Sequence, residues 1–142
     1  MEQKLNQIEV GKFNFTLPEA WEYTFDNGVI NIFNEALGVG VIQISHFEIS
    51  EGTPFILFDE FYDFISDLEN IKKDSFHFYN RIKKIREDFL TLEILKESNF
   101  FIYGMIYNSP SLIFITYNCN NIDRNKETDK VYKFFNDIQF IR

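Results

Sequence analysis

The sequence predicts an α+β domain: an antiparallel sheet of about six to seven strands with helices packed on its faces, in the order ββββ-α-βββ-α. Polar and apolar residues alternate over much of residues 12–47, and three further segments of strand length lie between 89 and 119. Two other segments instead repeat apolar residues at helical spacing. Runs of strands interrupted by one helix are typical of α+β folds with antiparallel sheets.

The first 48 residues are predicted to form a meander of four strands. Pro18 ends the first strand, because proline cannot donate a ladder hydrogen bond. Asp26-Asn27-Gly28 is a hairpin turn, since asparagine and glycine tolerate positive φ. Leu37-Gly38 makes the next turn. The four strands are expected at 12–17, 21–25, 29–33 and 39–47.

Two helices are expected, one in the middle of the chain and one near its end. The first has Thr53 as a plausible N-cap and Pro54 at its first position. Its apolar stripe comprises Phe55, Phe58, Phe61, Tyr62, Ile65 and Leu68. The second helix has Asn125 as its expected cap. Its buried stripe comprises Val131, Phe134, Phe135 and Ile138.

Three strands are expected between the helices, at 89–96, 100–107 and 112–119. The last two are apolar on both faces, so both faces must be covered, and we place these two strands at the centre of the sheet. Residues 74–87 keep neither periodicity, and we expect a loop with a short strand or turn there. Residues 139–142 are expected to form a short extended segment.

Composition limits the classes of function. The chain has 142 residues, which predicts one domain over 1–142. Its 14 basic and 22 acidic residues give a net charge of −8, which argues against nucleic-acid binding, because that needs lysine and arginine to displace counterions. The single cysteine, Cys119, excludes an intrachain disulfide. With no secretory signal and no apolar run long enough for a membrane span, a cytoplasmic protein without membrane contact is expected.

The segment Phe13-Asn14-Phe15-Thr16-Leu17-Pro18-Glu19-Ala20-Trp21 resembles the opening strand of the PsbP-like superfamily, an apolar-x-apolar-x-Leu-Pro-x-x-Trp pattern. The meander ending in Val41 to Ser45, the mid-chain helix, the paired strands and the final Ile138 to Ile141 follow the same layout. The resemblance implies an antiparallel sheet with helices on its faces. The characterised members of that group are mostly non-catalytic binding or assembly proteins. The shared positions carry no functional residue over to this chain.

Residues capable of catalysis lie in settings that favour structural roles. His46 and His77 have apolar neighbours and no second histidine at metal-ligand spacing. Cys119 ends a core strand with only asparagines beside it, so nothing local would activate its thiol. Glu93 is the most notable single acid: it either faces a covered side of the sheet, where burial would raise its pKa, or is paired or exposed at the rim. No phosphate loop or nucleophile elbow is present, and we predict no catalytic, cofactor-binding or metal site.

Charge is unevenly distributed along the chain. Residues 48–69 contain seven acids and no base, whereas residues 72–86 contain six bases and one acid. Four of the acids fall on the outer side of the first helix, namely Asp59, Glu60, Asp63 and Asp67. Such a cluster is either a solvated helix exterior or a surface that attracts a basic partner.

Three functions are compatible with these features. The first is a non-enzymatic protein-binding domain, in its strongest form an inhibitor or immunity-type protein that meets a basic partner through Asp59, Glu60, Asp63 and Asp67. The second is a carrier or sensor of a small apolar ligand, held near Phe76, Phe78, Tyr103 and Tyr107. The third is an enzyme that uses carboxylates such as Glu93.

Overall fold

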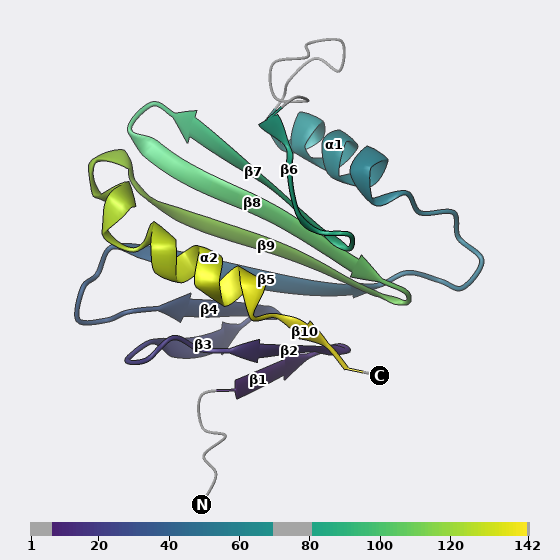
Figure 1. Ribbon diagram of the computed structural model, residues 1–142, viewed down its shortest axis with the longest axis horizontal. Coiled ribbons are helices and arrows are strands. Elements are labelled where there is room, and N and C mark those ends of the chain that lie inside the picture. Colours follow the sequence, from purple (N-terminus) through teal and green to yellow (C-terminus); the bar gives the residue numbers. More distant parts are fainter. Residues whose placement is uncertain (1–6, 70–80, 142) are drawn as a thin grey trace, which may run out of the picture.

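The computed structural model describes residues 7–69 and 81–141 and has a seven-stranded antiparallel sheet at its centre (Figure 1). The strand order is β3 (Glu22–Asp26), β4 (Val29–Phe33), β5 (Gly40–Glu48), β9 (Ser111–Asn120), β8 (Asn99–Asn108), β7 (Phe89–Lys96) and β6 (Lys83–Arg86). Strand β9 is therefore the middle strand and β8 lies beside it. The predicted fold class is confirmed, as is the central position of these two strands.

A second, three-stranded sheet was not predicted. It pairs β1 (Gln7–Val10) with β2 (Phe13–Thr16), and β2 with β10 (Gln139–Phe140), all antiparallel. The prediction of a single four-strand meander is thus wrong at its first strand, because β2 leaves the large sheet to pair with the C-terminus. Alternation along 12–17 marks a half-buried strand, but it carries no information about a partner that lies more than 120 residues away.

One face of the large sheet packs against α2 (Thr128–Asn136) and the small sheet (Figure 1). Isoleucines at alternate positions of β4, β5 and β9 point to this side, since successive side chains of a strand alternate between faces. They meet Phe13 and Phe15 of β2 and Phe134 and Phe135 of α2, all of which are buried. The predicted stripe Val131, Phe134, Phe135 and Ile138 is confirmed as buried.

The opposite face packs against α1 (Leu57–Leu68) over β7 and β8. Phe61 and Ile65 are fully buried against Leu92 and Tyr103. Strand β8 therefore contributes Phe100, Ile102 and Ile106 to one core and Tyr103 and Met105 to the other. A strand between two cores explains why its sequence is apolar on both faces.

The start of α1 differs from the prediction. The helix begins at Leu57 with Ile56 as its N-cap, so Thr53 and Pro54 lie before it. The Thr53 N–H instead donates to the Ser50 carbonyl in a turn at 3.1 Å. The ring of Phe55 stacks on Tyr107, with 4.1 Å between ring centroids, and we attribute the late start to this contact, which holds the chain against the end of the sheet.

The start of α2 also differs. Asn125 lies within a 3-10 helix, η2 (Asn121–Lys126). The N-cap of η2 is Asn120, whose side-chain oxygen accepts a hydrogen bond from the Ile122 N–H at 3.2 Å. Helix α2 follows with Glu127 as its N-cap. A loop with a short strand or turn was expected over residues 74–87, and the short strand β6 (Lys83–Arg86) confirms this for the end of that segment. Residues 74–80 lie outside the described residues.

Candidate functional site

The four predicted partner-binding residues lie together on the outside of α1. Asp59, Glu60, Asp63 and Asp67 are all exposed, while Phe61 and Ile65 on the other side of the helix are buried. We call these four residues the α1 acidic face. Their exposure follows from the helical period, which puts residues four positions apart on one side. Whether a partner uses them stays a prediction.

The acids of this face differ in what they do for the helix itself. Asp59 and Glu60 lie in the first turn, where a negative charge interacts favourably with the helix dipole. Asp67 lies near the C-terminal end, where the dipole disfavours a carboxylate, and the last turn holds no basic residue. Among the described residues, none of Asp59, Glu60 and Asp67 forms an ion pair. Helix stability therefore does not explain Asp67.

Glu69, which follows α1, has a structural role instead. Its side chain is only 5% exposed, and it accepts a hydrogen bond from the Tyr103 hydroxyl at 2.6 Å. Lys96 of β7 lies 2.9 Å from its other oxygen. The end of α1 is thus attached to β7 and β8 by one carboxylate.

The same kind of pair occurs twice more, at α2. Tyr132 of α2 donates to Glu93 of β7, and Tyr117 of β9 donates to Glu127 at 2.8 Å. Burial raises the pKa of all three paired tyrosines above the ordinary value of 10, and hydrogen bonds to neighbouring acidic groups raise it further. The three hydroxyls therefore stay protonated as donors, and each pair joins a helix or its flanking residue to the sheet.

Glu93 was the acid singled out for a carboxylate enzyme. The structure places it half-buried, with one carboxylate oxygen accepting from Tyr132 and its backbone carbonyl accepting from Arg81. It is therefore a paired glutamate, which was the alternative considered for it. Its bond partner lies 39 residues away on another element, so the strand pattern around Glu93 could not reveal it.

Glu127 is a buried acid that the sequence did not point to. It is 1% exposed, and its Oε2 atom has no hydrogen-bond partner among the described residues. Burial raises the pKa of the Glu127 carboxyl, and the hydrogen bonds from Tyr117 and the Gly40 backbone oppose that rise. A Cβ at Gly40 would lie 2.7 Å from the Tyr117 hydroxyl and 2.5 Å from the Asn118 carbonyl oxygen, so glycine is required for this approach.

Cys119 and His46 both lie within the packed structure. Cys119 is 6% exposed, as expected for a core cysteine, and burial raises the pKa of its thiol. His46 on β5 lies against Gly11, where an added Cβ would come within 2.3 Å of Nε2. His77 lies outside the described residues. In residues 7–69 and 81–141, no three His, Cys, Asp or Glu side chains gather as metal ligands.

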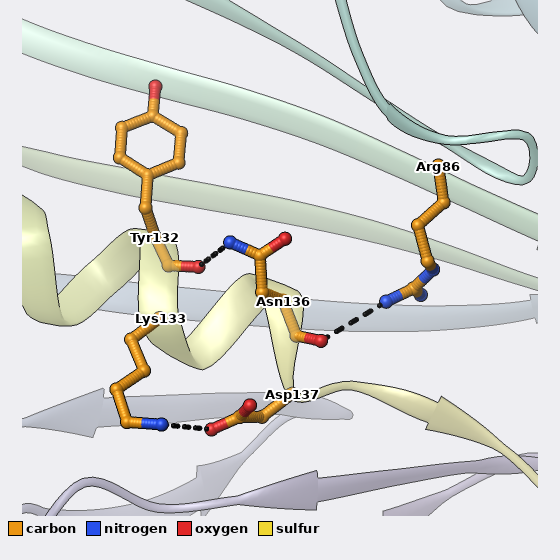
Figure 2. A network of polar contacts seen from close by, with 5 residues as sticks. All are labelled: Arg86, Tyr132, Lys133, Asn136 and Asp137. Atoms are coloured by element: carbon orange, nitrogen blue, oxygen red, sulfur yellow. Dashed lines mark hydrogen bonds and ion pairs between the residues drawn. The ribbon is translucent and has the colours of Figure 1, made fainter.

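A cavity of about 570 Å³ lies between the loop that follows β2 and helix α2. Thr16 to Ala20 form one wall, Lys130, Lys133, Phe134 and Asp137 form the other, and Asn34 also lines it. Figure 2 shows the Lys133 ammonium directed at the Asp137 carboxylate, 3.1 Å away. On the same helix, Asn136 donates to the Tyr132 carbonyl at 2.9 Å, and the Asn136 carbonyl accepts from Arg86. No local pattern in the sequence indicates this cavity, because its two walls are far apart in the chain.

The two described residues of the predicted apolar-ligand surface, Tyr103 and Tyr107, make internal contacts. Tyr103 is 5% exposed and bonded to Glu69, and Tyr107 is stacked on Phe55. Phe76 and Phe78 lie outside the described residues. Neither Tyr103 nor Tyr107 lines the cavity beside α2.

The strand order, the two faces and the helix positions define an α+β domain with a PsbP-like fold. The solution structure of cyanobacterial PsbP (CyanoP) from Synechocystis sp. PCC 6803 matches with a TM-score of 0.64 and 11% identity, over 91% of this chain and 86% of that one. A crystal structure from Bacteroides thetaiotaomicron VPI-5482 matches with a TM-score of 0.55 and 12% identity, over 92% of this chain and 46% of that one. No family model and no curated protein matches the sequence.

At these identities the likeness shows the fold alone. The resemblance read from Phe13 to Trp21 is thereby confirmed as a resemblance of fold. Among the described residues, no helix is long and apolar enough to cross a membrane.

Proposed function

We propose that this chain is a non-enzymatic protein-binding domain, of the inhibitor or immunity type, that binds a basic protein through the α1 acidic face. The observation that carries the proposal is the exposure of four carboxylates on one side of a helix whose other side is buried. Clustered charge of one sign raises the rate at which an oppositely charged partner associates. A net charge of −8 fits a basic protein partner better than a nucleic acid.

Asp67 supports a role in binding. A carboxylate near the C-terminal end of a helix costs about 0.3–1 kcal/mol through the dipole. Asp67 forms no ion pair with a described residue that would offset this cost. A contact with a partner's lysine or arginine would supply the missing interaction.

Apolar side chains flank the acidic face. Ile56, Phe64 and Leu68 are 64%, 39% and 48% exposed, respectively, at the helix or just before it. Protein interfaces combine apolar contacts with a polar rim, and aromatic residues often contribute most to affinity. The α1 surface has both components. The free, buried Cys119 is compatible with the cytoplasmic location that forms part of this proposal.

The test compares two triple variants with equal charge changes. One carries Asp59→Asn, Asp63→Asn and Asp67→Asn, and the control carries Glu22→Gln, Asp26→Asn and Glu35→Gln at exposed positions away from α1. The partner is captured from lysate of the source organism with the wild-type chain, identified, purified and measured by surface plasmon resonance. We expect the α1 variant to associate at least about tenfold more slowly at low salt, with a weaker salt dependence.

The control variant should associate within about twofold of the wild type. Circular dichroism establishes that both variants are folded. Equal association rates for the two triple variants would contradict the proposal, as would a captured partner with no basic surface.

A further inference from the structure

We propose that the cavity between the loop after β2 and helix α2 binds a small zwitterion with an apolar side chain, of the size of a dipeptide. Its volume of about 570 Å³ lies within the range of small-molecule sites. The cavity adjoins α2 and the small sheet, whereas α1 packs on the other face of the large sheet. This inference is therefore independent of the proposed function of α1.

The charges around the cavity define the ligand's charge. Lys133 is already paired with Asp137 at 3.1 Å (Figure 2). Lys130 on α2 and Glu19 on the loop form no ion pair with a described residue. These two groups, one positive and one negative, come from different walls. Burial raises the pKa of the nearby Glu127 carboxyl, and the Lys130 charge also acts on that carboxyl and lowers its pKa.

Asn34 adds a directional donor. Its Oδ1 atom accepts from the backbone N–H groups of Ala36 at 3.0 Å and Leu37 at 3.2 Å, which fixes the side chain. The Nδ2 group is then the part of the amide that is left to bind a ligand. Asn34 is 7% exposed and lines the cavity, and these two bonds hold its side chain in one orientation.

The apolar part of the lining comes from both walls. Leu17 and Phe134 are buried, and Pro18 and Ala20 complete the loop side. Ala20 has a φ of 73°, in a turn closed by the Trp21 N–H donating to the Pro18 carbonyl at 3.1 Å. Glycine is the usual residue at such a position, so a methyl group is kept at the cavity wall despite the backbone conformation.

These features assign the parts of the ligand. A carboxylate would bind Lys130 and the Asn34 Nδ2 group, an ammonium group would bind Glu19, and an apolar side chain would contact Leu17 and Phe134. The four ionised side chains of the lining sum to zero charge, so they offer no net attraction to a dianion such as phosphate.

The experiment uses three probes, namely the dipeptide leucyl-phenylalanine, its C-terminal amide and its N-acetyl form. Each is titrated into the wild-type chain and followed by the backbone NMR resonances of residues 16–20 and 130–137. We expect saturable shifts, with the free dipeptide binding at least about fivefold more tightly than either blocked form. In the Lys130→Gln variant, the free dipeptide should no longer bind more tightly than the amide. In the Glu19→Gln variant, it should no longer bind more tightly than the N-acetyl form.

Lys126→Gln serves as the matched control. Lys126 is exposed, paired with Asp123 and outside the cavity lining, so this variant should keep both preferences. No saturable shift with any probe would overturn the proposal. Equal affinities of the three probes for the wild type would also overturn it, as would tightest binding of the N-acetyl or amide form.

Discussion

The hydroxyl of Tyr117, in the middle strand of the large sheet, donates a hydrogen bond at 2.8 Å to the buried carboxylate of Glu127, the N-cap of α2. The pair places an acid beside the core, and one oxygen of that acid has no hydrogen-bond partner within residues 7–69 and 81–141. The same arrangement, a tyrosine donating to a glutamate between helix and sheet, recurs at Tyr103 with Glu69 and at Tyr132 with Glu93. These pairs make the stability of the domain depend on single hydroxyl groups, and the buried Glu127 adds a dependence on pH.

The first prediction concerns pH and Glu127. Its pKa in the folded chain is raised above the ordinary value of 4.5, so the folded state binds more protons than the unfolded state above that pH. This contribution to stability is therefore fully present below about 4.5 and is lost as the pH rises through the folded pKa. Glu127→Gln removes the titration and keeps an oxygen for Tyr117, so the variant should gain stability relative to the wild type as the pH rises.

The measurement is urea unfolding of both proteins at a series of pH values from 4 to 8 (about half a unit apart). Glu35→Gln, at an exposed position, is the control and should run parallel to the wild type. A constant difference in unfolding free energy between Glu127→Gln and the wild type across the series would contradict the prediction.

The second prediction concerns the hydroxyl of Tyr117. Tyr117→Phe leaves the Glu127 carboxylate buried with one partner fewer, which should cost about 1–3 kcal/mol of unfolding free energy at neutral pH. The loss should be smaller when Glu127→Gln is already present, because an uncharged amide is cheaper to leave unpaired. A double-mutant cycle by chemical denaturation measures this difference, and additive effects would show that the two groups do not interact.

The third prediction separates the two helices. Tyr103→Phe removes the bond to Glu69 after α1, and Tyr132→Phe removes the bond from α2 to Glu93. We expect Tyr103→Phe to accelerate amide hydrogen exchange mainly in α1, and Tyr132→Phe mainly in α2. Each variant is the control for the other. The same exchange pattern in both would mean that the pairs act only on global stability.

The fourth prediction concerns the turn at Ala20. A non-glycine residue at a φ of 73° costs about 1–3 kcal/mol, part of which the greater flexibility of glycine in the unfolded chain offsets. Ala20→Gly should therefore stabilise the domain by about 0.5–1 kcal/mol in thermal or urea unfolding. Ala36→Gly is the matched control, since Ala36 is exposed and has no positive φ, and it should be neutral or destabilising. Equal effects of the two substitutions would rule out strain at Ala20.

Local periodicity predicted much of this molecule correctly. Alternation placed most strands of the large sheet, and two-sided apolarity placed β8 and β9 at its centre, because side-chain direction in a strand depends only on the position along it. Helical spacing predicted which side of α1 would be buried, except at Leu68, which is 48% exposed. The same spacing predicted that Asp59, Glu60, Asp63 and Asp67 would be exposed. Cys119 was expected in the core because it is the last residue of a segment with the pattern of a core strand.

Other features were decided by residues distant in the chain. The pairing of β2 with β10 depends on the C-terminal segment, which returns to lie beside Phe13. We attribute the late start of α1 to the contact between the Phe55 ring and Tyr107. The burial of Glu127 depends on two strands, β9 and β5, which bring Tyr117 and Gly40 to it, so the residues next to Glu127 in the sequence did not indicate its burial. The cavity needs two walls that only the folded chain brings together. The sequence by itself determined which side of each element is apolar, because that is a local property. The tertiary structure alone decided which polar groups meet, because such contacts join segments that no local pattern connects.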